Sequence, residues 1–123
     1  MAALPAMEAA TNVNTLRAGE LEVTPREFRA TAAGRPLDLT ARELELLSAL
    51  VARAGRIVSR EELFGAVWGE RYQKSDRSVD VYVGKLRHKL EQALPDRRCI
   101  HTHFGFGYRF ELEPPPGAPP RDR

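Results

Sequence analysis

The segment 76–94 limits most strictly what this chain can fold into. Five apolar residues recur in it at helical spacing: Val79, Val83, Leu86, Leu90 and Leu94. At 100° per residue they fall on one narrow side of a helix, so the spacing predicts an amphipathic helix with one buried stripe. Such a helix requires a core of other elements to cover its apolar side.

The opposite side of this predicted helix is mostly cationic. It carries Arg77, Val81, Gly84, Lys85 and His88, where a solvated helix would alternate Glu and Lys four residues apart. Valine and glycine among cations indicate a surface that contacts an anionic and partly apolar partner. The major groove of DNA fits, because cations bind phosphate or guanine there and small apolar side chains meet the thymine methyl group.

Length and composition limit the classes of protein to which the chain can belong. The 123 residues, 42% hydrophobic and 29% charged, suffice for one domain with a modest core. No apolar run is long enough for a membrane span, and the start of the chain lacks the basic and apolar regions of a signal peptide. We therefore expect a cytoplasmic protein with no membrane partner. The single cysteine, Cys99, excludes an internal disulfide.

The net charge of +2 conceals an uneven distribution. Residues 70–110 contain 9 Lys and Arg against 5 Asp and Glu, whereas residues 1–69 contain 8 against 9. A local cationic excess is typical of a nucleic-acid-binding face, although a solvated basic patch has the same composition.

The first part of the chain predicts a small sheet. Residues 1–15 lack periodicity and are expected to form a disordered arm. Between residues 16 and 39, short alternating segments broken by Pro25 and Ala33-Gly34 predict three or four antiparallel strands. The residues expected to cover one side of this sheet are Leu21, Val23, Phe28 and Leu37.

Two capping boxes mark the starts of two further helices. Thr40 is followed three positions later by Glu43, and Ser59 by Glu62. Gly55 is expected to end the first of these helices in a left-handed conformation. The residues expected to face the core are Leu44, Leu47, Leu50 and Val51 in the first helix and Leu63, Phe64 and Val67 in the second.

The remaining segments complete a winged helix-turn-helix. Ile57-Val58 predicts a short strand between the two capped helices, and Pro95 breaks the third helix. The strands 98–103 and 108–112 flank a glycine-rich turn, which predicts a hairpin. Residues 113–123 are proline-rich and predict a disordered tail. The fold class is thus α+β over residues 16–112: an N-terminal four-stranded antiparallel sheet, three helices and a C-terminal β-hairpin wing.

Three stretches together resemble the winged-helix effector domain of OmpR/PhoB-type response regulators. They are LTARELELLSALVARAGRIVSREELFGAVWG, DRSVDVYVGKLRHKL and GFGYRF. The resemblance covers about residues 16–112. It implies a sequence-specific, double-stranded DNA-binding transcription regulator from bacteria, a two-component-system protein whose third helix enters the major groove and whose wing touches the neighbouring minor groove.

Matching positions imply a set of DNA contacts. Asp80, Val81 and Lys85 would read bases, because a carboxylate can accept from cytosine, valine methyls can meet thymine and lysine can donate to guanine. The expected phosphate and backbone contacts are Trp68, Arg77, Tyr82, Arg87 and Tyr108. The expected DNA-binding set also includes Ser78, His88 and Thr102.

The resemblance further implies partners and an assembly. The loop 70–74 corresponds to the segment that meets a sigma or alpha subunit of RNA polymerase in activators of the family. Relatives bind tandem half-sites as dimers, so we expect a monomer in solution and a tandem dimer on DNA. The residues before the first predicted strand are too few for the family's receiver domain, which leaves open an excised effector domain or a free-standing regulator.

Two positions depart from the family's pattern. Phe104 stands where the wing commonly has a minor-groove arginine, so Phe104 or Phe106 is expected either to press on sugars or to pack under the wing. Gly84 replaces a basic residue of many relatives, which indicates either a close approach of the backbone to DNA or a lost phosphate contact.

Other interpretations of single residues stay open. Asp80 and Arg87 can pair with each other instead of contacting DNA, and Trp68 can be a core residue alone. Cys99, His101 and His103 share a face of a strand, but without a fourth ligand we expect no metal site and no cofactor.

The sequence also bears on two function classes other than DNA binding. No nucleophile with a base and no paired carboxylates in a cleft are evident, so we expect no enzyme. The alternative function is a winged-helix protein–protein interaction module with weakened DNA binding. Salt dependence discriminates, because affinity for DNA falls steeply with salt when phosphates are neutralised.

Overall fold

The N-terminal third of the chain forms an antiparallel sheet. The computed structural model describes residues 15–69, 72–73 and 76–113, so the predicted arm, apart from Thr15, and the predicted tail, apart from Glu113, lie outside the described residues. The four strands are β1 (Leu16–Ala18), β2 (Leu21–Thr24), β3 (Arg29–Ala32) and β4 (Arg35–Pro36), in the order β1-β2-β3-β4. A short 3-10 helix, η1 (Pro25–Glu27), joins β2 to β3.

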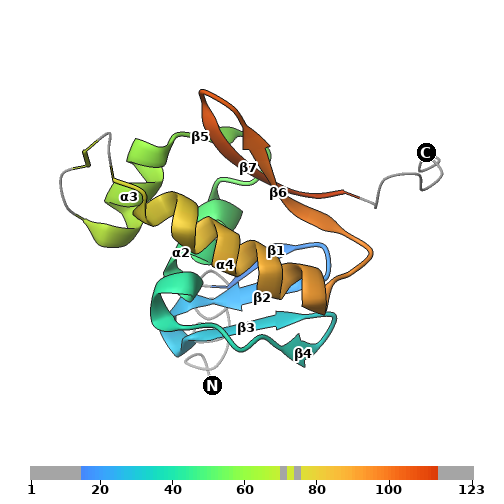
Figure 1. Cartoon of the computed structure of the whole chain (residues 1–123). Coiled ribbons are helices and arrows are strands. Elements are labelled where there is room, and N and C mark those ends of the chain that lie inside the picture. Colours follow the sequence, from blue (N-terminus) through green and yellow to red (C-terminus); the bar gives the residue numbers. More distant parts are fainter. Residues whose placement is uncertain (1–14, 70–71, 74–75, 114–123) are drawn as a thin grey trace, which may run out of the picture.

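The helices lie between most of this sheet and a terminal hairpin, and Leu112 of the hairpin reaches the β1–β2 turn at Gly19. Helices α2 (Ala41–Ala52), α3 (Arg60–Trp68) and α4 (Ser78–Ala93) follow the sheet, with β5 (Ile57–Val58) between α2 and α3. The hairpin consists of β6 (Arg98–His103) and β7 (Gly107–Glu113), and the second sheet has the order β5-β7-β6. Figure 1 shows the first sheet on one side of the helices and the hairpin on the other. The predicted α+β winged helix-turn-helix is confirmed.

The buried stripe of α4 is confirmed residue by residue. Val79, Val83, Leu86, Leu90 and Leu94 are at most 5% exposed. They join one core cluster with Leu21 and Val23 of the first sheet, the apolar side of α2, and Phe110 of the hairpin. One continuous core therefore fixes α4 relative to both sheets.

One predicted core residue is wrong. Phe28 is 72% exposed, because it ends η1 in the left-handed region (φ 52°) with its N–H donated to the carbonyl of Pro25 at 3.0 Å. The ring therefore lies at the surface and not in the core. The small residues Ala30 and Ala32 are buried on β3 instead.

The two predicted capping boxes differ. In the first, Thr40 Oγ1 accepts from the N–H of Glu43 at 3.2 Å and Glu43 Oε1 accepts from the N–H of Thr40 at 2.9 Å, as predicted. In the second, Ser59 Oγ accepts from the N–H of Glu62 at 3.0 Å. The carboxylate of Glu62 pairs instead with Arg53 and Arg56, so this box is only half formed.

Two helix ends are shifted from their predicted positions. Helix α2 ends at Ala52, and Gly55 (φ +92°) lies beyond it, where its N–H donates to the carbonyl of Phe110 at 2.9 Å. Helix α4 begins at Ser78, two residues after Asp76, and Asp76 Oδ1 accepts the N–H of Ser78 at 2.8 Å. In the described residues, no helix combines the length and hydrophobicity needed to cross a bilayer.

The base of the wing is fixed by a close approach of two strands. Val58 of β5 pairs with Tyr108 of β7, and Gly107 has a φ of +142°. A Cβ at Gly107 would lie 2.0 Å from the carbonyl oxygen of Val58, so only glycine fits there. The start of β7 is therefore packed directly against β5, next to the start of α3.

Candidate nucleic-acid interface

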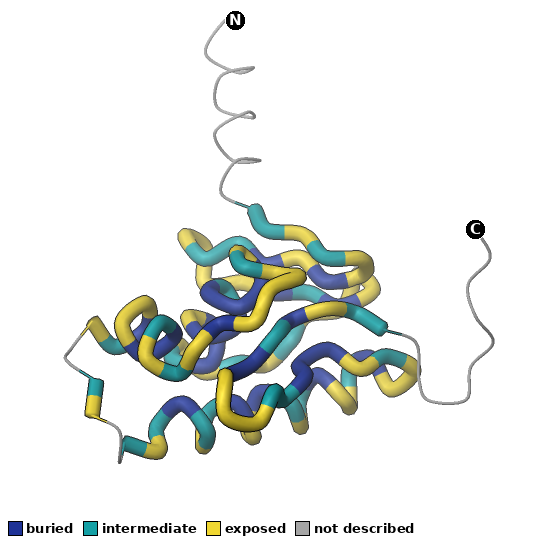
Figure 2. The backbone as a smooth tube through the Cα atoms, turned by 90° about the horizontal axis from the view of Figure 1, so that it is seen from above, coloured by how far each residue is buried: buried dark blue, intermediate teal, exposed yellow. Residues whose placement is uncertain are grey.

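The cationic side of α4 is open to solvent. Arg77, Gly84, Lys85 and His88 are exposed, and Val81 is 51% exposed. Figure 2 shows α4 along one side of the molecule, with exposed residues recurring along it. Neither the core nor the wing covers the predicted surface.

Aromatic side chains support this surface where α3 meets α4. Trp68 is half-buried and stacks on Phe64, with ring centroids 5.1 Å apart. Its edge-to-face contact with Tyr82 has a centroid distance of 5.6 Å, and Arg42 lies over its ring at 5.1 Å. Lys85 Nζ lies 4.9 Å from the centroid of Tyr82. Trp68 is therefore a packed residue that keeps part of its surface open.

Asp80 joins α3, α4 and the wing. Its Oδ1 accepts from Arg60 Nε at 2.7 Å and from the hydroxyl of Tyr108 at 2.5 Å. The side chain of Asp80 is 26% exposed and Tyr108 is 5% exposed. Burial alone would raise the pKa of Asp80, but the hydrogen bonds from Tyr108 and Arg60 outweigh it and lower the pKa below its usual value.

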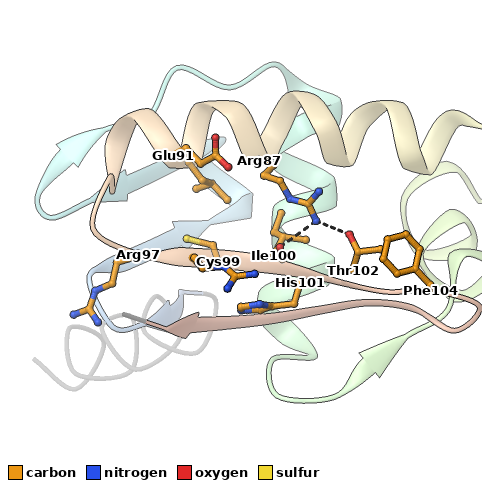
Figure 3. A pocket seen from close by; sticks show the side chains of 10 residues that line it. Arg87, Glu91, Arg97, Cys99, Ile100, His101, Thr102 and Phe104 are labelled. Carbon is orange, nitrogen blue, oxygen red and sulfur yellow. Dashed lines mark hydrogen bonds between the residues drawn. The ribbon is translucent and has the colours of Figure 1, made fainter. Parts of the chain in front are cut away.

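Arg87 connects α4 to the wing and does not pair with Asp80. Its Nη2 donates to the carbonyl of Ile100 at 3.0 Å and to Thr102 Oγ1 at 2.9 Å, as Figure 3 shows. The predicted alternative pairing of Asp80 with Arg87 is wrong, since each of the two side chains has other partners. The hairpin and helix are thus tied together at the Arg87 guanidinium.

The remaining predicted residues lie at the two ends of the exposed side. Ser78 is the half-buried first residue of α4, and Arg77 precedes it. His88 lies three residues beyond Lys85, with its Nε2 3.2 Å from Gln92 Nε2. The structure thus brings Arg77, Val81, Lys85 and His88 onto the exposed side of α4, whereas Asp80 and Arg87 turn toward the wing.

Sequence reasoning missed the side chains that hold α4 in place. Arg60 binds Asp80 across 20 positions, and Lys89 Nζ donates to Glu43 Oε1 at 2.7 Å and to the carbonyl of Asp38 at 2.8 Å. Local spacing carries no signal for such contacts. Arg60 and Lys89 look like ordinary solvated helix cations in the sequence.

The histidines and cysteine of β6 have protein partners or are shielded. His101 Nε2 lies 2.9 Å from the carbonyl oxygen of Glu111, and His103 Nε2 accepts from Arg109 Nε at 3.1 Å. Burial raises the pKa of the Cys99 thiol to about 11, so it stays protonated. Among the residues that the structure describes, no three His, Cys, Asp or Glu side chains are grouped to hold a metal ion.

Comparison with known proteins shows to which family this domain belongs. Residues 34–110 match the family described as "Transcriptional regulatory protein, C terminal". The chain belongs to this family. Its OmpR/PhoB-type members are transcriptional regulators, and the family is not one of enzymes.

Individual relatives of this OmpR/PhoB-type domain support the assignment. The response regulator MprA of Mycolicibacterium vanbaalenii is 38% identical over 96 residues, which cover 78% of this chain and 41% of MprA. The phosphate regulon regulatory protein PhoB of Escherichia coli is 38% identical over 90 residues, covering 73% of this chain and 39% of PhoB. The chain therefore spans less than half the length of these curated relatives.

Solved structures of the family have the same fold. The RstA DNA-binding domain of Klebsiella pneumoniae, in complex with the RstA box, has a TM-score of 0.70 and 31% identity, covering 79% of this chain and 96% of that one. The DNA-binding domain of CpxR from E. coli has a TM-score of 0.67 and 33% identity, covering 79% and 95% respectively. These likenesses confirm the winged-helix DNA-binding fold.

Proposed function

We propose that this domain regulates transcription by binding double-stranded DNA sequence-specifically, with α4 in the major groove. One observation carries the proposal: the cationic side of α4 is exposed along its length while the opposite side is anchored in the core. The similar RstA domain has been crystallised on the RstA box, which supports the same use of this fold.

Base reading is assigned to the middle of α4. The methyl groups of Val81 suit a thymine methyl, and the ammonium group of Lys85 suits guanine O6 and N7. Both side chains are exposed and lie one turn apart on the same side of the helix. The exposed Gly84 next to Lys85 leaves room for close approach of the helix backbone, since a Cβ there would meet nothing within 4 Å.

Phosphate binding is assigned to residues around this centre. Arg77 and His88 lie at the two ends of the exposed side, and Arg87 uses Nη2 for the wing but has five N–H donors in all. The half-buried Trp68, Ser78, Tyr82 and Thr102 complete the proposed backbone contacts. These contacts would fix the register of α4 without reading sequence.

We assign Asp80 and Tyr108 a different role from the base and phosphate contacts that the resemblance implies. The Tyr108 hydroxyl proton is already donated to Asp80, and Oδ1 of Asp80 already accepts two hydrogen bonds. Both side chains are largely buried. They act as positioning residues that fix the angle between α4 and the wing.

Two alanine variants test the proposal on duplexes selected from random DNA. Lys85→Ala should cost about 1 to 3 kcal/mol of binding free energy and relax base preference at one position. Arg77→Ala should weaken binding to all sequences alike. Arg35→Ala is the matched control, because Arg35 is exposed on β4, in the other sheet. Unchanged affinity and specificity of Lys85→Ala would refute the base-reading assignment.

Other expected partners stay predictions. The loop 70–74, expected to meet RNA polymerase, lies mostly outside the described residues. The monomer in solution and the tandem dimer on DNA are likewise expectations from the resemblance. Failure of the wild-type domain to bind any duplex would favour the alternative function, a protein-interaction module.

A further inference from the structure

The tip of the wing carries two exposed aromatic rings. Phe104 is 86% exposed and Phe106 is 72% exposed. The expectation that one of them packs under the wing is therefore wrong. A phenylalanine ring offers a large apolar area to a partner, and two of them on one hairpin tip form a local apolar surface of the kind that marks an interaction site.

The turn itself holds these rings outward. Phe104, Gly105 and Phe106 form the turn between β6 and β7, and the N–H of Phe106 donates to the carbonyl of His103 at 2.9 Å. Gly105 adopts a φ of +84°, and a Cβ there would meet nothing within 4 Å. The tip is thus narrow, closed by a hydrogen bond and free of packing on its outer side.

The surroundings of the tip favour an anionic partner. Phe104 lies at one end of a cleft between α4 and β6; Arg87 lines the cleft on the α4 side, whereas Arg97, which is paired with Glu20, lines the opposite end (Figure 3). In Figure 3 the side chain of Phe104 lies beside that of Thr102, whose Oγ1 accepts a hydrogen bond from Arg87. Phe104 is therefore held on the side of the wing that faces α4, beside the residue that binds the Arg87 guanidinium. Nucleic acid combines phosphates with apolar base faces in this way.

We propose that the wing tip acts as an aromatic wedge that enters the minor groove beside the α4 site and partly unstacks a base step. Apolar wedges bend DNA at the step they open. Pyrimidine–purine steps such as TA unstack more easily than A-tracts, so the tip would add sequence preference without hydrogen bonds to bases. This inference rests on the proposed function of α4.

The test compares wing variants on two duplexes with the same α4 site. One duplex carries a TA step at the flanking minor groove and the other a rigid A-tract, and 2-aminopurine beside the step reports unstacking by its fluorescence. Phe104→Ala and Phe106→Ala should each weaken binding to the TA duplex roughly 5- to 150-fold, the range for loss of an aromatic contact with a base. Both should abolish the rise in fluorescence and change the A-tract affinity less.

Matched variants separate a wedge from a general loss of binding. Phe28→Ala removes a ring that is as exposed as Phe106 but lies beside the first sheet, and it should change nothing. Phe104→Leu keeps an apolar side chain and should retain part of the fluorescence rise. Because both rings at the tip are exposed, the variants should fold as wild type does, which thermal unfolding checks.

The outcomes distinguish this inference from the function on which it rests. Equal affinity and equal fluorescence for wild type and both alanine variants, with binding still lost in Lys85→Ala, would overturn the wedge and leave DNA reading by α4 intact. It would assign the tip to a protein partner instead. Failure of wild type to bind either duplex would overturn both proposals.

Discussion

Asp80 places a carboxylate at the junction of three elements. Its bonds to Arg60 and Tyr108 connect α4 to α3 and to β7. Tyr108 is buried and Asp80 is 26% exposed, so this hydrogen bond to a charged acceptor is largely shielded from water. A side chain on the DNA-facing helix is therefore devoted to holding that helix in place.

Substitutions at this junction should destabilise the domain to different degrees. Tyr108→Phe removes one hydrogen bond and should cost about 1 to 2 kcal/mol of unfolding free energy, whereas Asp80→Ala leaves both Arg60 and the buried hydroxyl without their acceptor and should cost about 2 to 4. Urea denaturation measures both. In a double-mutant cycle the two effects should be strongly non-additive; simple additivity would mean that the short hydrogen bond contributes little.

His101 should make stability depend on pH. Burial is the main reason that its pKa is lowered, and Glu113 opposes this only in part. Because the unfolded chain binds the proton more readily, stability is fully present above the usual histidine pKa of 6.5 and is lost as the pH falls below it. His101→Gln keeps a donor for the Glu111 carbonyl without titrating. Urea midpoints measured from about pH 7.5 to about pH 5.5 should fall more for wild type than for the variant; parallel curves would contradict the assignment.

At the scale of elements, sequence patterns predicted what depends on local spacing. The stripe of α4 and the cap at Thr40 follow from helical periodicity and a four-residue signature, and both are present. Phe28 could not be placed, because it adopts a left-handed conformation that spacing does not predict. The carboxylate of Glu62 does not complete its capping box, because it pairs with Arg53, nine positions away, and with Arg56, six positions away.

The candidate site was predictable to the same extent. The exposed side of α4 follows from the position of the buried stripe, so Val81 and Lys85 could be placed from the sequence. The partners of Asp80 and Arg87 could not, because they lie 13 to 28 positions away along the chain and meet only when the wing packs beside the helices. The spacing of residues along the sequence gives no information about such long-range contacts.

An ion pair with one buried partner adds to the core contacts between α4 and α2. Glu43 is 3% exposed, and its Oε1 accepts from Lys89 of α4 and from the N–H of Thr40. Burial alone would raise the pKa of Glu43, but the hydrogen bonds from Lys89 and Thr40 outweigh it and lower the pKa. The carboxylate thus caps one helix and anchors another.

Removing the cation from this pair should be costly. Lys89→Met removes the cation beside a buried carboxylate that keeps the Thr40 N–H, and because Lys89 is 35% exposed it should cost about 1 to 3 kcal/mol of unfolding free energy. The double variant Glu43→Gln/Lys89→Met removes both charges and should recover part of that loss. Chemical denaturation compares the three proteins; a double variant less stable than Lys89→Met would show that the charge of Glu43 was not the source of the cost.

At the scale of the whole molecule, the hydrophobic core extends from the first sheet to the hairpin, whereas the excess positive charge is local. One core cluster extends from the first sheet through the helices to Phe110 in the hairpin, so the reading helix and the wing are parts of one body. The cationic excess is confined to residues 70–110, while the molecule as a whole carries only +2. Electrostatic attraction to DNA must therefore come from this local excess, and orientation on DNA from the shared core.

The salt dependence of DNA affinity should show that the attraction comes from the local cationic surface. If Arg77, Arg87 and His88 neutralise about two to three phosphates, a fourfold rise in salt should lower the association constant about 12- to 40-fold. Arg77→Ala should reduce the slope of log K against log salt by about one. Arg35→Ala, on the far sheet, should leave the slope unchanged, because its charge lies outside the cationic surface. Fluorescence anisotropy titrations at several salt concentrations measure the slopes. A flat dependence would mean that affinity does not come from phosphates, and the cationic side of α4 would then face a protein.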